Sequence, residues 1–419
     1  MNEVKKQVQR TIFLVDMNAF FITCEMKRNP DLKGKPAAVA GDPSRRSGII
    51  LAANYEARAL GIKTTMTLQQ AMKLCPDLVL VPPDHAYYDQ NSRLVMEYLS
   101  KYSPVIEQNS IDEAWIDMTG TENLFGDAQT AAKKIMQGLM EELDLWCSIG
   151  ISSNKFLAKM ASEMKKPLGI TELQIKDVPA KLWPLPVGFM YGVGQKTSET
   201  LNKLNIFTIE DLAKSDREKL VRVFGKTALT LHDHAQGIDH DPVIERSPDD
   251  IKSIGKSVTL SKDIIKLEEA KSVLLKLSDE VSIRARLKGK KGHTVQITLK
   301  YSDFRVITRQ CQIHQSNLPN QIYQAGSALL NECWNPTKPI RLIGIALTDF
   351  DDSSTGKQLS LFDIGSSDVQ KIESVTDVKD ERLQQAVDDI RNKFGKDIVS
   401  RASFMKQVNP SSSEEDQKQ

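Results

Sequence analysis

Two adjacent carboxylates interrupt a strand-forming stretch at residues 110–117, which read SIDEAWID. Neighbouring side chains of a regular strand point to opposite faces of the sheet, so Asp112 and Glu113 can serve one site only where the backbone turns. The flanking segments VIEQN and AWIDM are both typical of short strands, which predicts a hairpin over residues 105–118 with the pair at its tip. A solvated acidic turn is the plainer interpretation of the pair taken alone.

A third acid ends the first apolar run of the chain. The segment TIFLVDM at 11–17 is typical of a buried strand and places Asp16 near its end. If this strand lies beside the hairpin, its carboxylate joins the pair, and three carboxylates suit two hard cations roughly 4 Å apart. Mg²⁺ prefers oxygen ligands and shares them with substrate phosphates, so we expect two Mg²⁺ ions here and phosphoryl transfer as the chemistry.

Length and composition exclude several classes of protein. A chain of 419 residues predicts more than one domain. No apolar run approaches the length of a bilayer, and the polar start MNEVKKQVQR is unlike a secretory signal, so we expect no membrane contact and a cytoplasmic location. The five cysteines show no CxxC spacing, which favours reduced thiols over structural zinc.

The net charge of +1 conceals an uneven distribution along the chain. Residues 251–348 carry 16 Lys and Arg against 7 Asp and Glu, whereas residues 349–419 carry 10 against 15. A basic module between less basic neighbours favours a polyanionic partner for that module, and a solvated basic face is the alternative. Charge alone leaves both interpretations open.

Helical and strand patterns are mixed along the chain and predict an α+β multidomain fold. From residue 251 the predicted order is β-α-β-β-α-β, that of a ferredoxin-like split unit. Segments with helical spacing are 18–29, 51–61, 84–103, 126–145, 154–167, 266–287, 318–334 and 379–394. Segments with strand patterns are 11–17, the 105–118 hairpin, 146–152, 253–260, 294–301, the run that follows it to 313, and 339–350.

Three further side chains can contact phosphate. In NYEAR, Tyr55 and Arg58 are three residues apart on a predicted helix and share a face, where a hydroxyl and a guanidinium can grip a triphosphate. Lys166, just before a helix-breaking Pro167, can add a third contact. An ordinary surface pair and a solvated lysine are the alternatives.

Phe21 follows the first strand and is most simply a core residue, or a ring beneath a bound sugar.

Two motifs point to macromolecular partners. GVG at 192–194, followed by KT within a helix–hairpin–helix pattern over 176–240, is typical of contact with the DNA backbone without sequence specificity. KQLSLFD at 357–363 places Leu359, Leu361 and Phe362 in an otherwise polar segment, which suggests a docking peptide. An additional edge strand of the basic module is the alternative for this segment.

Together these segments resemble the Y-family, or translesion, DNA polymerases. The resemblance covers nearly all of residues 10–350, in family order. The matching segments are VDMNAFF, NYEARALGIKTTM, SIDEAWID, GISSNKFLAKMASEMKKPLG, PVGFMYGVGQKT and SIGKSVTL.

The resemblance implies a right-hand architecture and a role for each candidate residue. It implies a palm over 10–19 and 87–175, fingers over 20–86, a thumb with the helix–hairpin–helix over 176–240, a linker over 241–250, a little finger over 251–349, and a flexible tail over 350–419 with a short helix. The implied metal ligands are Asp16, Asp112 and Glu113, with the Met17 carbonyl. The implied nucleotide contacts are Phe21 as the steric gate that selects deoxyribonucleotides, and Tyr55, Arg58 and Lys166 on the triphosphate. The implied DNA contacts are Gly192, Gly194, Lys196, Lys252 and Lys256. The implied peptide for a sliding clamp is 358–363, with Gln358, Leu359, Leu361 and Phe362.

The sequence departs from the family at a few positions. Asn18 stands where many relatives have a second Asp, so we leave it out of the metal set. Ala52 replaces a frequent hydroxyl residue near the triphosphate, and Phe189 and Tyr191 make the entry to GVG bulkier than usual. None of these changes removes a residue that the chemistry requires.

The expected function is template-directed addition of deoxynucleotides to a primer 3′ end, with error-prone lesion bypass and without proofreading. The expected partners are primer–template DNA, deoxynucleoside triphosphates and a sliding clamp, and we expect a monomer that associates with the nucleoid when active. A palm-type cyclase, a metal nuclease and a non-catalytic clamp-bound scaffold are the alternatives. Intact Asp16, Asp112 and Glu113 argue against the scaffold.

Overall fold

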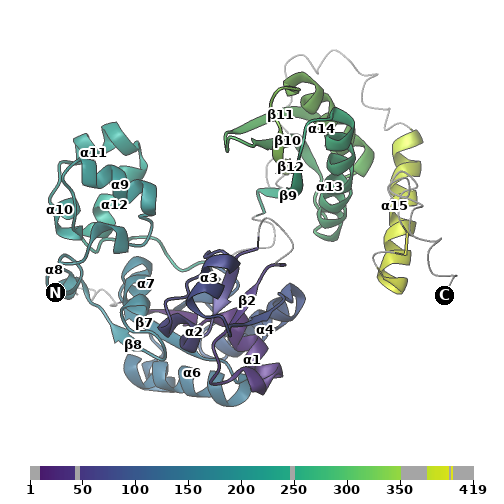
Figure 1. The fold of residues 1–419 in the computed structure, drawn as a ribbon. Coiled ribbons are helices and arrows are strands. Elements are labelled where there is room, and N and C mark those ends of the chain that lie inside the picture. Colours follow the sequence, from purple (N-terminus) through teal and green to yellow (C-terminus); the bar gives the residue numbers. More distant parts are fainter. Residues whose placement is uncertain (1–9, 43–47, 246–250, 351–374, 396–397, 400–419) are drawn as a thin grey trace, which may run out of the picture. The chain divides into compact units, whose positions relative to one another are not determined.

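The computed structural model describes residues 10–42, 48–245, 251–350, 375–395 and 398–399. The chain divides into two compact units, residues 1–247 and 248–419, and each is described by itself (Figure 1). Their boundary falls inside the segment 241–250 that the sequence predicts as a linker. Among the described residues, no helix combines the length and the apolar character that crossing a bilayer requires.

The first unit is built on a five-stranded sheet. Its order is β5-β6-β1-β7-β8, with β1 antiparallel to both of its neighbours and β8 parallel to β7. The first strand, the hairpin and the 146–152 strand are therefore confirmed. The strands are β1 (Ile12–Met17), β5 (Ile106–Gln108), β6 (Glu113–Asp117), β7 (Cys147–Ser152) and β8 (Ile170–Glu172).

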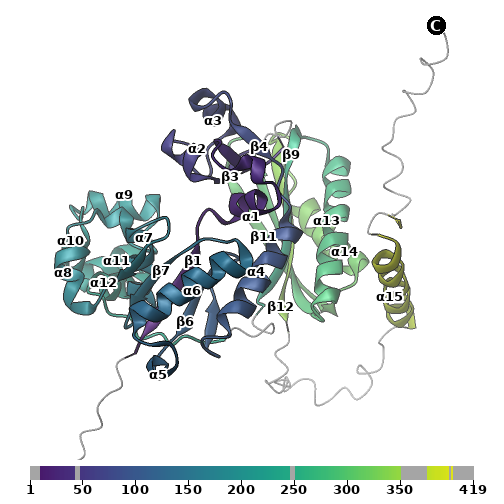
Figure 2. The ribbon, with the colours of Figure 1, turned by 90° about the horizontal axis from the view of Figure 1, so that it is seen from below.

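Helices cover both faces of this sheet, so β1 is buried along its whole length. On one face, Phe13 and Val15 join the core formed with α1 (Phe20–Arg28), α4 (His85–Leu99) and α6 (Ala128–Leu143). Helices α4 and α6 lie side by side there (Figure 2). Both are shorter than the predicted 84–103 and 126–145: α4 ends at Leu99, and α6 begins at Ala128, directly after Asp127, whose side chain caps it.

The other face of the sheet packs on α7 (Lys155–Met164). Ile12 and Leu14 of β1 contact Trp115 of β6 and Ala158 of α7 in a small core. Side chains of a strand alternate between faces, so the next residue on this face of β1 is Asp16. The alternation thus brings an acid out at the end of an apolar stripe, directly beside α7.

A smaller three-stranded sheet packs next to the first, in the order β3-β2-β4. The predicted helix over 51–61 is wrong in its first part, because residues Ile50–Ala53 form β3 and pair with β2. This pairing buries Ala52 and Ala53 and outweighs the helix propensity of alanine. Asn54 then caps α2, and Gly61 follows the helix with a φ of 86°. The remaining elements here are β2 (Ala37–Ala40), β4 (Val79–Val81), η1 (Pro30–Leu32), α2 (Tyr55–Ala59) and α3 (Leu68–Leu74).

Short helices follow the large sheet, as predicted for 176–240, and share their own core. The turn between α9 and α10 is set by Asn205, which has a φ of 61°, and by a capping box of Thr208 and Asp211. The elements are η2 (Ile175–Asp177), α8 (Val178–Lys181), η3 (Val187–Phe189), α9 (Gln195–Lys203), α10 (Ile209–Ala213), α11 (Arg217–Phe224) and α12 (Thr227–Ala235). One more short helix, α5 (Glu122–Phe125), lies between β6 and α6 and packs on α6.

The second unit has the predicted β-α-β-β-α-β order. Its antiparallel sheet runs β11-β10-β12-β9, so that each β-α-β unit is split by a strand of the other. Helices α13 and α14 lie side by side on one face, and the other face carries no helix among the described residues (Figure 1). The elements are β9 (Ser253–Ile264), α13 (Leu267–Leu287), β10 (Gly292–Tyr301), β11 (Val306–Ser316), α14 (Pro319–Cys333) and β12 (Ile340–Phe350).

The helix predicted near 379–394 is confirmed as α15 (Val375–Phe394). Asp388 on this helix accepts two hydrogen bonds from Arg286 of α13, at 2.6 and 2.9 Å. Lys291 and Glu381 form a second ion pair at 2.7 Å. The predicted docking peptide 358–363 lies outside the described residues.

Candidate active site

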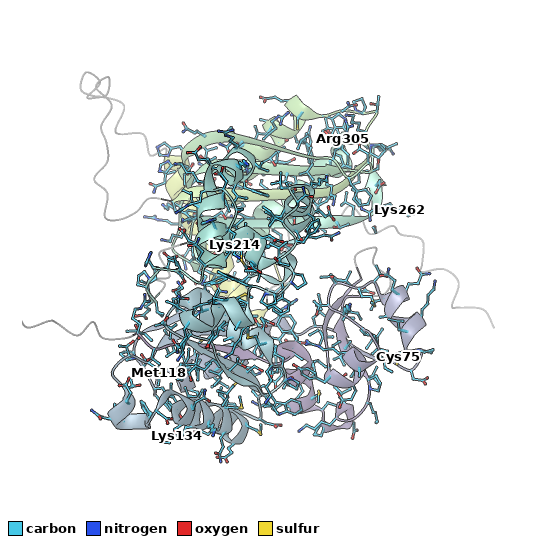
Figure 3. The ribbon with its side chains drawn as sticks, turned by 90° about the vertical axis from the view of Figure 1, so that its left-hand side faces the viewer. Cys75, Met118, Lys134, Lys214, Lys262 and Arg305 are labelled. Atoms are coloured by element: carbon cyan, nitrogen blue, oxygen red, sulfur yellow. The ribbon has the colours of Figure 1, made fainter. Side chains whose placement is uncertain are left out.

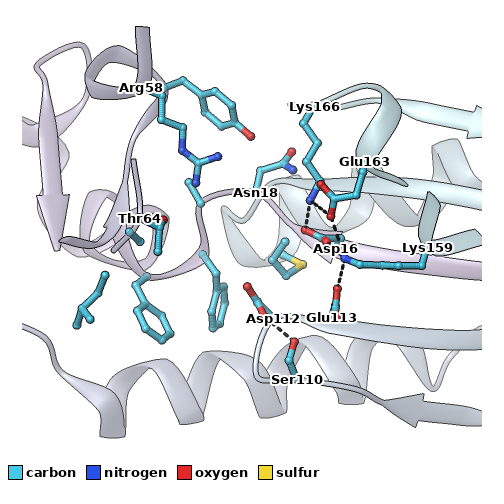
Figure 4. A pocket seen from close by; sticks show the side chains of 17 residues that line it. Asp16, Asn18, Arg58, Thr64, Ser110, Asp112, Glu113, Lys159, Glu163 and Lys166 are labelled. Atoms are coloured by element: carbon cyan, nitrogen blue, oxygen red, sulfur yellow. Dashed lines mark hydrogen bonds and ion pairs between the residues drawn. The ribbon is translucent and has the colours of Figure 1, made fainter. Parts of the chain in front are cut away.

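One cavity of about 360 Å³ opens at the end of β1 in the first unit. Figure 4 shows the carboxylates on one side of this cavity and Arg58 and Thr64 on the other. All predicted metal and nucleotide residues line it, namely Asp16, Met17, Phe21, Tyr55, Arg58, Asp112, Glu113 and Lys166.

The three acids converge because of strand register. Asp16 lies directly opposite Glu113 in the β1–β6 pair, and Asp112 precedes β6 in the turn, where its carbonyl accepts from Met17 N at 2.8 Å. Ser110 Oγ donates to Asp112 at 2.6 Å, and Asn109 Nδ2 donates to Glu113 at 2.5 Å. The turn thus directs two adjacent carboxylates into one site and fixes both.

Two lysines lie among these acids. Lys159 Nζ, on α7, is 3.0 Å from Asp16 Oδ2, 2.6 Å from Glu113 Oε2 and 2.9 Å from Glu163 Oε1. Lys166 Nζ is 2.8 Å from Asp16 Oδ1 and 2.9 Å from Glu163 Oε1. Each oxygen of Asp16 therefore contacts a different ammonium group (Figure 4).

The surroundings keep both lysines charged. Burial alone would lower the pKa of Lys159, but the carboxylates of Asp16 and Glu113 more than offset this and raise it above its usual value. The pKa of Lys166 is raised in the same way, by Asp16 and Glu163 against the effect of burial.

Sequence reasoning missed Lys159 and Glu163. Their spacing of four residues on α7 is a signal for an ion pair on one helix face, but a solvated pair has the same spacing. Only the packing of α7 on β1 shows that this face meets Asp16.

The residues fit a divalent metal in type and in convergence. Carboxylate oxygens are the ligands that Mg²⁺ prefers, and all three acids border one cavity. Within the ranges that the structure describes, however, no group of three or more His, Cys, Asp or Glu side chains is arranged to hold a metal ion as it stands. The ammonium groups of Lys159 and Lys166 lie within 3.0 Å of the Asp16 carboxylate, and that of Lys159 also lies 2.6 Å from Glu113.

The opposite side of the cavity carries polar groups with unused hydrogen-bonding capacity. The hydroxyl of Tyr55 is buried and has no hydrogen-bond partner among the residues that the structure describes, and burial raises its pKa. A buried polar atom of this kind is costly unless a ligand satisfies it. Arg58 donates through Nε to the Ala53 carbonyl at 2.8 Å, and its guanidinium points into the cavity (Figure 4).

Phe21 lines the same cavity. Its ring stacks on that of Tyr88 at a centroid distance of 4.4 Å, and Tyr88 is fully buried. The Tyr88 hydroxyl donates to Glu25 at 2.6 Å, and Glu25 in turn pairs with Arg28 at 2.7 Å. Phe20, by contrast, is a core residue, 3% exposed.

The departures from the family lie close to these groups. Asn18 is buried, donates to Ser148 Oγ at 3.0 Å and accepts from Leu168 N at 2.9 Å, which ties down the loop that carries Lys166. Ala52 lines the cavity and supplies no side-chain hydrogen bond. Phe189 and Tyr191 are 47% and 40% exposed.

The predicted DNA contacts lie on both units. Gly192 has a φ of 89°, Gly194 precedes α9, and Lys196 lies exposed in its first turn. Lys252 of the second unit is exposed, whereas Lys256 lies 3.5 Å from Glu280 of α13. These roles in DNA binding stay predictions.

The uncovered face of the second sheet is lined by small, polar and aliphatic side chains. A shallow cavity of about 410 Å³ there is bordered by Gly255, Ser257, Thr298, Lys300, Gly344 and Ala346. At one end, Lys300 and Arg341 flank the exposed ring of Phe304 at 4.8 and 4.9 Å. Lys262 on β9 and Arg305 in the turn before β11 extend outward from the same unit (Figure 3).

Comparisons with known proteins find relatives that cover both units of the chain. The impB/mucB/samB family matches residues 15–163, its C-terminal domain matches 251–361, and its helix–hairpin–helix motif matches 176–206. The chain is 53% identical to a protein named DNA polymerase IV from Clostridium kluyveri, over 95% of this chain and 99% of that one. It is 54% identical to a DNA polymerase IV from Alkaliphilus oremlandii, over 94% and 98%.

A solved structure supports the same assignment. The Y-family DNA polymerase chimera Dbh-Dpo4(243-245)-Dbh superposes with a TM-score of 0.73 and 28% identity, covering 81% of this chain and 99% of that one. With identities above 50% over nearly full length and matches in both units, the chain belongs to the Y-family of translesion DNA polymerases.

Proposed function

We propose that this DNA polymerase extends a primer by two-metal phosphoryl transfer at the cavity of the first unit. The observation that carries the proposal is the convergence of Asp16, Asp112 and Glu113 at one end of a cavity whose other end holds Tyr55 and Arg58. Acids at one end suit the reacting oxygens with their metal ions, and the cationic end suits a triphosphate.

Two Mg²⁺ ions would be held by Asp16, Asp112, Glu113 and the Met17 carbonyl, and would activate the primer hydroxyl and stabilise charge on the transferring phosphoryl group. The remaining side chains bind and orient the nucleotide. Tyr55 OH gains the partner that it lacks by donating to a phosphate oxygen. Arg58 and Lys166 supply the positive charge.

Phe21 would select the sugar. Its ring is held in place by the Tyr88 stack, so a ribose 2′-hydroxyl above it would meet a rigid apolar surface rather than a side chain that can move aside. Deoxynucleoside triphosphates are the substrates that this surface admits.

DNA would be held mainly through its phosphates. The Gly192–Lys196 segment, with its N–H groups at the start of α9, and basic side chains of the second unit such as Lys252 are the proposed contacts. The sliding clamp would bind the 358–363 peptide, and the protein would act as a monomer in the cytoplasm, at the nucleoid when active.

A primer-extension assay on plain and damaged templates tests the proposal. Wild-type protein with Mg²⁺ and deoxynucleotides should lengthen a labelled primer, and Glu113→Ala should reduce the rate by about 10³-fold. Glu122→Ala, which removes an exposed carboxylate on α5, is the matched control and should retain full activity. Shortening of the primer would indicate a nuclease, and wild-type activity in Glu113→Ala would contradict the metal assignment.

A further inference from the structure

Lys159 has no role in the function proposed so far, although it is the most highly connected cation of the active site. Its ammonium group contacts three carboxylates, and the residue is only 8% exposed. Three donors on one ammonium meet three acceptors, so its hydrogen-bonding capacity is filled. A lysine in this position is not a solvated surface charge.

We propose that Lys159 is the built-in counterion of the site, and that it competes with the divalent cation for Asp16 and Glu113. This inference rests on the proposed metal role of the acids. The ammonium lies between one oxygen of Asp16 and one of Glu113, which are the groups that a divalent cation must also contact. A lysine and a cation cannot hold the same oxygens, so cation binding requires Lys159 to release them.

The need for a counterion follows from the packing. Asp16 and Glu113 are neighbours across two strands, and the Asp16 residue is 7% exposed, so water screens their repulsion poorly. Lys159 satisfies both carboxylates and keeps the cavity formed before a cation arrives.

Lys159 also has an ion-pair partner, Glu163, that it can keep when a cation binds to the other two acids. Glu163 lies one helical turn further along α7 and accepts from both Lys159 and Lys166 at 2.9 Å. It is the most exposed of the three acceptors, with 39% of its side chain accessible. Lys159 can therefore retain its ion pair with Glu163 when Asp16 and Glu113 bind a cation. Lys166 can then release Asp16 and pair with a phosphate instead.

Mn²⁺ binding to the full-length protein, without DNA or nucleotide, tests this competition. Free Mn²⁺ is measured by electron paramagnetic resonance, and thermal unfolding is recorded with and without Mn²⁺. Lys159→Met should bind Mn²⁺ about tenfold tighter or more, because a positive charge next to the cation is removed. Its Tm should be lower than that of wild type without Mn²⁺, and the difference should close when Mn²⁺ is added.

Three further variants serve as controls. Lys159→Arg retains the charge and should stay within about threefold of the wild-type affinity. Lys165→Met removes an exposed lysine next to Lys166 that does not line the cavity, and should leave Mn²⁺ affinity unchanged. Lys166→Met should tighten Mn²⁺ binding in the same direction but less, which provides a second test should Lys159→Met fold poorly.

The outcomes separate this inference from the function on which it rests. If Asp112→Asn and Glu113→Gln leave Mn²⁺ binding unchanged, the acids are not metal ligands and the proposed function fails. If those variants abolish binding while Lys159→Met and Lys166→Met fail to tighten it, only the counterion role is overturned. In primer extension, Lys159→Met should also lower the Mg²⁺ concentration that gives half-maximal rate.

Discussion

The two large sheets of this polymerase differ in where their charged side chains lie. In the first unit β1 is buried on both faces, and charged side chains appear only where the strand ends, at Asp16. In the second unit β11 is exposed along most of its length, and the uncovered face of the sheet carries small side chains together with partly exposed Lys and Arg side chains at one end. The first arrangement holds a few charges in fixed geometry, and the second presents charges to solvent.

We expect this difference to separate the sheet that carries the chemistry from the sheet that binds DNA. The acids of the first sheet are positioned by ion pairs of 2.6 and 3.0 Å with a buried lysine, and phosphoryl transfer requires such fixed geometry. Solvent-exposed cations suit phosphates that slide past, since counterion release needs charge density more than exact geometry. Substitutions at the first sheet should therefore alter the rate of the chemical step, and substitutions at the second should alter DNA affinity.

The largest expected effect comes from a substitution at the active site of the first unit, which should impair the chemical step and leave DNA binding intact. Asp112→Asn retains the shape of the side chain and its hydrogen bond with Ser110 but removes the negative charge. We expect the single-turnover rate to fall by about 10³-fold, while DNA affinity stays within about twofold. Quench-flow kinetics and fluorescence anisotropy measure the two quantities. A parallel loss of DNA affinity would show that the two functions are not separated in this way.

The next effect concerns sugar selection at the same cavity. Phe21→Val removes most of the ring surface, and incorporation of ribonucleotides should rise by about 10²-fold relative to deoxyribonucleotides. Tyr88→Leu leaves the ring but removes the stack at 4.4 Å, so a smaller rise of about tenfold is expected. The ratio of kcat/KM for the two nucleotides is the measurement. Equal ratios in wild type and Phe21→Val would exclude the steric-gate role.

The sequence predicts every strand of the two large sheets except β8, which has only three residues, but it predicts only part of the site. Local patterns suffice for β1, for the acidic hairpin and for the β-α-β-β-α-β order, because alternation and turn residues are local. They mislead at Ala52 and Ala53, where pairing with β2 decides the structure. The role of Lys159 cannot be predicted from local patterns either, because its partners Asp16 and Glu113 lie 143 and 46 residues away in the chain.

A moderate effect is expected at the second sheet. Lys300→Ala with Arg341→Ala removes both cations that flank Phe304, and duplex affinity should fall about tenfold. The slope of log affinity against log salt should decrease by about 2, one for each lost phosphate contact. The rate at saturating DNA should be unchanged. Lys133→Ala with Lys134→Ala, on the exposed side of α6, is the charge-matched control and should leave both values unaltered.

The smallest expected effect concerns single ion pairs, and tests whether a buried pair in the first unit is stronger than an exposed pair in the second. Lys256 and Glu280 of the second unit lie 3.5 Å apart with 38% and 49% of their side chains exposed, so solvent screens their attraction. A double-mutant cycle to alanine should give a coupling of about 0.5 kcal/mol in the free energy of unfolding. Lys155 and Glu107 of the first unit lie 2.6 Å apart with 12% and 3% exposed, and Lys155 also packs on Trp115, so their coupling in the same assay should be several times larger. Equal couplings would mean that burial does not set the strength of charge pairing in this molecule, and the contrast between the two sheets would lose its physical basis.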